Sequence, residues 1–331
     1  MAKKKKCYSG IGGQAVLEGI MMKNKDQYSI AVRKPNGEIE VDVEAYSGAA
    51  SHAKITKLPF FRGIFNFVDS LYLGTKCLNY SASFYEEEDE KTDPKKEKFI
   101  MAATTAVSIV FAIALFMVLP YYLSTLLSGY VRNESLLAII EGIIRLILFL
   151  SYVAAIALMK DIRRVYMYHG AEHKCINCIE KGRPLTVSDV MKSSRFHKRC
   201  GTSFLLIVML ISIVLFFFIR VDSPVLRVVI RLALIPVIAG ISYEFIRLAG
   251  KSDNFIVNIL SKPGLWLQRL TTREPDEGMV EVAIAAVNAI FDWKAYLKET
   301  FGYEVDESWL KEYSEASNET ENAEVVTGDN A

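Results

Sequence analysis

Four long apolar segments are the feature that most restricts how this 331-residue chain can fold. They cover residues 99–127, 136–159, 203–219 and 225–249. A helix needs about 20 mostly apolar residues to cross the hydrocarbon core of a bilayer. The first and third segments meet this requirement easily, and the second and fourth meet it less cleanly because they carry ionisable side chains. Short links at 128–135 and 220–224 lead us to expect a mainly α-helical, multi-pass membrane protein with about four spans in two helical hairpins.

Four of those ionisable side chains form two pairs, each one helical turn apart: Glu141 with Arg145, and Arg227 with Arg231. Ionisable groups within a span are functional candidates by default. Most of these lie near segment ends, however, which favours side chains that reach out to the lipid headgroups. A transporter would become the preferred function if the two pairs faced each other inside the bundle.

The composition supports a membrane protein and excludes other classes. Hydrophobic residues make up 51% of the chain while 23% of residues are charged, which is typical of apolar spans separated by aqueous segments. A net charge of +1 without a basic stripe predicts no nucleic-acid partner. Five cysteines are too few for a disulfide scaffold. No apolar stretch follows Lys3 to Lys6, so we expect no cleavable signal peptide.

Basic residues predict the orientation. The loop from Lys160 to Cys200 contains ten Lys or Arg, against one, Arg132, between the first two spans. Basic loops stay in the cytoplasm. We therefore expect the long loop and both termini on the cytoplasmic side of a bacterial cytoplasmic membrane, where cysteines remain thiols.

The N-terminal region contains three recognisable patterns. Residues 27–45 alternate on either side of Pro35-Asn36-Gly37, which predicts a β-hairpin. Residues 58–79 repeat apolar side chains at helical spacing, and predict either a helix in the membrane interface or one packed on the protein. Gly10-x-Gly12-x-x-Ala15 touches a dinucleotide fingerprint but has no strand before it, so we expect a tight structural turn.

These patterns divide the chain into four parts. Residues 1–98 form a cytoplasmic region with the hairpin, the amphipathic helix and, at 86–98, a charged linker. Residues 99–249 form the membrane region, which includes the cytoplasmic loop 160–202. Residues 250–311 form a cytoplasmic helical region, with a helix from about Met279 to Lys298. Residues 312–331 are acidic and predict a disordered tail.

The cytoplasmic loop gathers the side chains that bind metals. Three of the four histidines and three of the five cysteines fall within 32 positions, from His169 to Cys200. The first half reads His169-x-x-Glu172-His173, the order of the inverted zincin motif. On a helix His169 and His173 share one face, with Glu172 beside them.

The second half of the cluster is His197-x-x-Cys200, just before the third apolar segment. We expect a helix to about Glu180 and a short second helix capped by Thr186-x-x-Asp189, a hairpin that would return the chain to the first half. The expected ligands of a divalent metal, most simply zinc, are then His169, His173 and Cys200.

Two further assignments complete this hypothesis, and two alternatives remain open beside it. His197 would be a fourth ligand or an orienting neighbour, and Glu172 a general base acting on water that the metal activates. Alternatively, Cys175-x-x-Cys178 and His197-x-x-Cys200 would together make a closed structural zinc site. A chain without any metal is the third reading.

Four stretches make the chain resemble the DUF1385 family, the YqhQ-like bacterial membrane proteins. They are Gly12 to Met22, Tyr168 to Lys174, His197 to Phe204, and Pro263 to Pro275. The resemblance implies a multi-pass membrane protein that has been labelled a predicted metal-dependent enzyme, with no established substrate.

The resemblance also implies which residues matter: His169, Glu172, His173, His197 and Cys200. Many relatives have proline where this chain has Lys198, a change that should leave the ligands intact. Cys175 and Cys178 do not look like part of the family's core motif, so the Cys-x-x-Cys site loses support.

The function expected from all of this is a membrane protein with a His/Glu/Cys metal site, acting as a metal-dependent hydrolase with Glu172 as catalytic base. Its place at the membrane surface suggests a lipid-linked or membrane-protein substrate. The alternatives are a non-enzymatic scaffold or assembly and quality-control factor with a structural metal, and a transporter.

Overall fold

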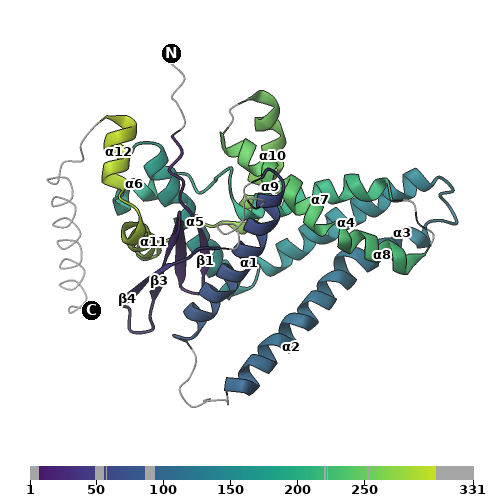
Figure 1. The fold of residues 1–331 in the computed structure, drawn as a ribbon, viewed down its shortest axis with the longest axis horizontal. Helices are drawn as coiled ribbons and strands as arrows, with labels where there is room; N and C mark the ends of the chain where they lie inside the picture. The colour runs from purple at the N-terminus through teal and green to yellow at the C-terminus, as the bar shows by residue number, and fades with distance from the viewer. Residues whose placement is uncertain are drawn as a thin grey trace, which may run out of the picture. The chain divides into compact units, whose positions relative to one another are not determined.

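A computed structural model describes residues 7–48, 56, 58–85, 94–219, 221, 223–251 and 254–302. Residues 86–93 of the expected linker and the expected tail at 312–331 lie outside this described part. The described part of the chain is mainly helical, as the sequence predicts, and it contains one small antiparallel sheet (Figure 1). The described residues fall into two compact units that do not follow sequence order. Unit 1 comprises the described residues within Met1–Tyr46, Met167–His197 and Arg273–Ala331, and unit 2 those within Ser47–Tyr166 and Lys198–Thr272.

Unit 1 contains the sheet, four antiparallel strands in the order β1-β2-β3-β4, which Figure 1 shows side by side. The strands are β1 (Gly12–Val16), β2 (Gly19–Asn24), β3 (Gln27–Arg33) and β4 (Ile39–Ala45). The predicted hairpin is confirmed as β3–β4, with Ala31 paired to Val41 and Gly37 in the left-handed region at φ 88°. Only a residue without a Cβ adopts that φ at little cost.

The first hairpin corrects the expectation of a tight structural turn at Gly10-x-Gly12-x-x-Ala15. Residues Gly12–Val16 form strand β1, and the turn is confined to Leu17 and Glu18. A Cβ on Gly13 would lie 2.6 Å from the carbonyl oxygen of Met21 and 2.9 Å from Cγ of Glu172. Glycine in a strand often marks such a close approach of another element. Gly13 therefore lets the sheet lie against the helix that carries Glu172.

The helices of unit 1 share one hydrophobic core with this sheet. They are the part of α5 (Lys160–Glu180) from Met167 onward, α6 (Val187–Met191), α11 (Glu277–Ile290) and α12 (Trp293–Phe301). The predicted C-terminal helix is interrupted at Phe291, where the backbone is extended, and Asp292 caps a new helix. α11 packs on β2 and β3, where Ser29 Oγ donates to the carbonyl of Ala286 at 2.6 Å.

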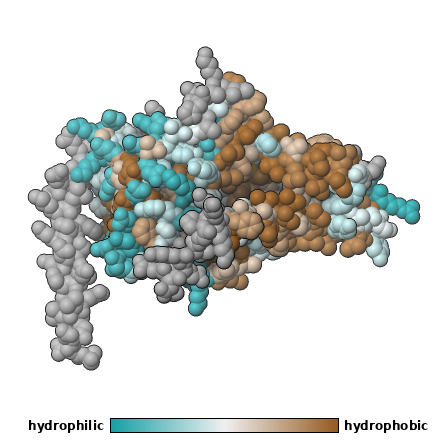
Figure 2. Space-filling view, turned by 60° about the horizontal axis from the view of Figure 1, so that its bottom comes forward, coloured by the Kyte–Doolittle hydropathy of each residue, from teal (hydrophilic) through white to brown (hydrophobic). Residues whose placement is uncertain are grey.

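Unit 2 consists of helices. They are α1 (Phe61–Ala82), α2 (Pro94–Ile113), η3 (Ala114–Val118), α3 (Leu119–Leu126), α4 (Glu134–Ile156), α7 (Gly201–Phe217), α8 (Pro224–Ala233), α9 (Ile235–Lys251) and α10 (Phe255–Thr271). α4 and α7 meet around Phe149, Val153 and Leu206. The face drawn in Figure 2 has a large hydrophobic area, and α2 exposes Phe99, Val107 and Phe111.

Three helices in the described part of the chain are long and apolar enough to cross a membrane: Phe99–Leu126, Glu134–Ile156 and Pro224–Gly250. These correspond to the first, second and fourth predicted spans. The third corresponds to α7, which has 17 residues and is shorter than the other three. The structure thus supports three spans by length and composition, where the sequence predicts about four.

The amphipathic helix predicted at 58–79 is α1, and one of its faces packs on α9. A Cβ on Gly63 would lie 2.8 Å from Cβ of Tyr243 and 3.0 Å from Cα of Gly240. The guanidinium of Arg62 also pairs with both carboxylate oxygens of Glu244. Packing on the protein, one of the two alternatives, is therefore confirmed. A different face exposes Val68, Leu71 and Tyr72, so an interfacial location stays a prediction.

Candidate metal site

The predicted motif helix is α5, and it buries most of the motif. Glu172 is 4% exposed and His173 is 1% exposed, while His169 is half-buried. His169 and His173 lie one turn apart, and their ring centroids are 4.4 Å apart. The sharing of one helix face by these two imidazoles, expected from their spacing, is confirmed.

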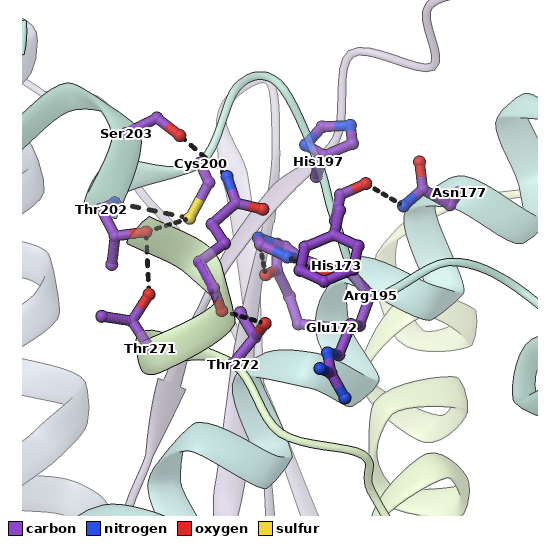
Figure 3. Close-up of polar contacts among 12 residues, drawn as sticks. Glu172, His173, Asn177, Arg195, His197, Cys200, Thr202, Ser203, Thr271 and Thr272 are labelled. Atoms are coloured by element: carbon purple, nitrogen blue, oxygen red, sulfur yellow. Dashed lines mark hydrogen bonds and ion pairs between the residues drawn. The ribbon is translucent and has the colours of Figure 1, made fainter. Parts of the chain in front are cut away.

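A backbone carbonyl orients the ring of His173. Nδ1 of His173 lies 2.6 Å from the carbonyl oxygen of Arg195 (Figure 3). A carbonyl can only accept, so Nδ1 must carry the proton, and in a neutral ring the lone pair then sits on Nε2. Nε2 lies 3.5 Å from Oε2 of Glu172. This is the arrangement common at metal-binding histidines, whose other ring N–H is donated to a carbonyl or carboxylate.

His197 lies close to His173 but faces a different carboxylate. Their ring centroids are 5.6 Å apart. Nε2 of His197 is 3.7 Å from Oε2 of Glu180. The other oxygen of Glu180 accepts from both the backbone N–H and the hydroxyl of Ser9, at 3.0 and 2.9 Å. Unit 1 thus places His197, the first residue of the second half of the cluster, beside the first half.

Two side chains that the sequence did not single out hold the segment that carries Arg195. The buried ammonium of Lys174 donates to the carbonyls of Met191 and Ser193, at 2.7 and 3.0 Å. The amide of Asn177 donates to the carbonyls of Ser194 and Phe196. The available signal was that Lys174 and Asn177 are polar residues three positions apart on the motif helix.

Two further contacts fix α5 within unit 1. The hydroxyl of Tyr168 donates to Glu18 at the β1–β2 turn, at 3.2 Å. Gly170 lies against the chain after Thr272, so that a Cβ there would be 2.0 Å from the carbonyl oxygen of Arg273. Glu18 is a third residue that sequence reasoning missed, because strands β1 and β2 on either side of it were not expected.

Cys175 and Cys178 belong to the hydrophobic core of unit 1. Burial raises the pKa of the Cys178 thiol to about 12, and burial together with the nearby Cys178 and Glu172 raises the pKa of Cys175 well above its usual range. The thiol of Cys178 donates to the carbonyl of Pro184 at 3.1 Å. Both thiols lie among apolar side chains, in line with the loss of support for the Cys-x-x-Cys site.

These thiols are expected to resist alkylation at pH 8 in the folded protein and to react once it is unfolded. Since their pKa values are raised in the folded state, their contribution to stability is full below the ordinary thiol pKa and falls as the pH rises through the folded values. Mass spectrometry after iodoacetamide treatment would measure this, with half-buried Cys7 as the reactive control. Modification of Cys175 as fast as Cys7 would contradict it.

Cys200, the remaining predicted ligand, lies in unit 2 at the start of α7. Its sulfur accepts from the backbone N–H of Thr202 at 3.4 Å and lies 3.1 Å from the hydroxyl of the same residue (Figure 3). The hydroxyl of Thr271 donates in turn to that of Thr202. Cys200 therefore caps α7, the helix that corresponds to the third apolar segment, and its thiol is buried.

Comparison with known proteins gives a family but no activity. The model of a family described as "Protein of unknown function (DUF1385)" matches residues 58–293. The chain is 36% identical over 295 residues to "Uncharacterized protein YqhQ" of Bacillus subtilis (strain 168), an alignment covering 86% of this chain and 93% of that protein. No solved structure matches the chain.

Proposed function

The chain belongs to the DUF1385 family of proteins of unknown function, and we propose that it is a membrane protein with a divalent-metal site. The observation that carries the proposal is the orientation of His173. The carbonyl of Arg195, 2.6 Å from Nδ1, leaves the lone pair on Nε2, beside Glu172. A metal bound to Nε2 would lie beside that carboxylate, whose negative charge would offset the charge of the cation.

The ligands we propose are His169, His173 and Cys200, a His/His/Cys set that could hold zinc. The chain between His197 and Cys200 supports the inclusion of the thiol. Three residues span at most about 11 Å between Cα atoms, and the ring of His197 is 5.6 Å from that of His173. His197 would be a fourth ligand or an orienting neighbour, and its approach to Glu180 favours the second role.

The reaction that suits these residues is hydrolysis. A divalent metal supplies Lewis acidity, which lowers the pKa of water toward neutrality. Glu172 would accept the proton of the attacking water and deliver it to the leaving group. Its carboxylate is buried and faces His173, so the proton would be held away from bulk solvent. The protein would thus be a metal-dependent hydrolase with Glu172 as the catalytic residue.

We place this site on the cytoplasmic face of the bacterial cytoplasmic membrane, with both termini in the cytoplasm. The three long apolar helices support a membrane location, and the ten basic residues between Lys160 and Cys200 support the side. Such a position would give access to a lipid-linked or membrane-protein substrate.

Two other functions remain as alternatives. A structural metal would make the protein a scaffold or an assembly and quality-control factor, but Lys174 and Asn177 already hold the returning segment by direct hydrogen bonds. A transporter is favoured by a different observation, the burial of Glu141, Arg145 and Arg231 against one another in unit 2.

Metal analysis of the purified full-length protein tests the proposal. We expect about one zinc ion per chain in the wild type and in His52→Ala, which changes the one histidine outside the cluster, and loss of the metal in His173→Ala and Cys200→Ser. Glu172→Gln should keep the metal and the fold but lose function when it replaces the wild-type protein in cells. A metal-free wild type would exclude both metal hypotheses. Full cellular function of Glu172→Gln, with unfolding of the ligand variants, would instead support the structural metal.

A further inference from the structure

Three ionisable side chains meet inside unit 2, which corrects the expectation that they reach the headgroups. Glu141, Arg145 and Arg231 are 6%, 3% and 3% exposed. Arg145 Nη2 donates to Oε1 of Glu141 at 2.8 Å, and Arg231 holds both oxygens of Glu141, at 2.6 and 3.0 Å. Arg145 does not lie near a helix end, because it is the twelfth of the 23 residues of α4 and lies roughly 16 Å from either end.

A proline in the first span supplies the neighbouring acceptor. An α-helical bond to the carbonyl of Phe116 would come from the N–H of residue 120, but Pro120 has none. The helix widens there into the π-turn η3, a feature frequent at functional sites. Nε of Arg145 donates to the Phe116 carbonyl at 3.0 Å. The cluster therefore combines side chains and backbone from α4, α8 and the first span.

The charges of the cluster do not balance. Two guanidinium groups face one carboxylate, which leaves a net charge of +1 in a helical bundle of apolar segments. Intramembrane charges are normally paired with one another. Moreover, Nε of Arg231 is buried and has no hydrogen-bond partner among the residues that the structure describes. Among the described residues, the Nε–H donor of Arg231 thus has no acceptor, and one positive charge of the cluster has no counter-charge.

We propose that this cluster binds a halide ion, chloride in the cell, which accepts the Nε–H of Arg231 and neutralises the excess charge. The ring of Phe216 covers the faces of both guanidinium groups, 4.8 Å from Arg145 and 5.0 Å from Arg231. An anion must therefore approach at the guanidinium edge, where the N–H groups point. A monovalent anion matches the charge of +1. The site is independent of the proposed metal site.

Chloride binding to the full-length protein in detergent tests the proposal. With gluconate keeping the ionic strength constant, we expect saturable binding of one radioactive chloride per chain and a melting temperature that rises with chloride and then levels off. Bromide should replace chloride. Absence of saturable binding to the wild type would overturn the proposal.

Substitutions on α8 locate the site. Arg231→Gln leaves the balanced pair Glu141–Arg145 and should weaken chloride binding at least tenfold. Arg227→Gln is the matched control, one turn away on the same helix, where the guanidinium donates to the carbonyl of Val221. It should keep the wild-type Kd. If Arg231→Gln does not fold, Arg231→Lys retains the charge but lacks Nε–H, and a tenfold weaker Kd is again expected. A wild-type Kd in the folded Arg231 variant would overturn the assignment.

Discussion

Replacing Gly170 by alanine is expected to lower the free energy of unfolding by about 3 kcal/mol, at the upper end of the usual range for overpacking. The new Cβ would lie 2.0 Å from the carbonyl oxygen of Arg273, and backbone atoms cannot move aside as a flexible side chain can. Helix propensity alone predicts the opposite sign, because alanine stabilises a helix interior by up to about 1 kcal/mol relative to glycine.

The matched control for this substitution is Gly201→Ala. Gly201 is the first residue of α7, and a Cβ there would meet no atom within 4 Å. Thermal unfolding of the two variants beside the wild type would separate the effects. We expect a fall of roughly 5–10 °C for Gly170→Ala and little change for Gly201→Ala. Equal melting temperatures would show that α5 does not pass this close to Arg273.

Lys174→Met is expected to have an effect of comparable size, because it removes a donor from two backbone carbonyls. The ammonium of Lys174 bonds the carbonyls of Met191 and Ser193 and pairs with Glu274 at 2.9 Å. Each buried polar group left unpaired costs about 1–3 kcal/mol, so we expect destabilisation of about 2–5 kcal/mol. Most of it should come from the carbonyls, since the side chain of Glu274 is 60% exposed and its pairing is screened by water.

The same substitution should also weaken metal binding. Lys174 holds the segment whose Arg195 carbonyl orients His173. Loss of such orienting partners typically costs about 10–100-fold in metal affinity. Competition with a zinc chelator would measure this in the folded variant, with exposed Lys181→Met as control. Unchanged affinity in Lys174→Met, despite lower stability, would mean that the segment holds His173 without this lysine.

Patterns confined to a few neighbouring residues were predictable. The helical spacing of His169 and His173 predicted their shared face, and Thr186 accepts from the backbone N–H of Asp189 as the capping pattern indicates. The Asn-Gly turn predicted the β3–β4 hairpin. In each of these cases the residues that determine the structure are also the residues that form it, so no distant partner is needed.

Features that depend on distant partners were missed. The acceptors of Lys174 are backbone carbonyls 17 and 19 positions away, which carry no side-chain signature. Glu141 and Arg231 are 90 positions apart, so nothing local indicates that they meet. Their position near the ends of apolar segments suggested contact with headgroups, whereas the structure buries them together. Gly13 looked like a turn residue because the close approach of Glu172 cannot be read from β1 alone.

The division of unit 1 into three stretches of chain has a consequence for biosynthesis. Ser29 of the sheet bonds the carbonyl of Ala286, 257 positions later. At translation rates of about 5–20 residues per second, α11 is synthesised roughly 13–50 seconds after the sheet. The apolar segments between them leave the ribosome first. The histidines are therefore assembled with their supporting sheet only late in synthesis, and a nascent chain that stops before Glu277 carries the motif helix without the helix that covers β2 and β3.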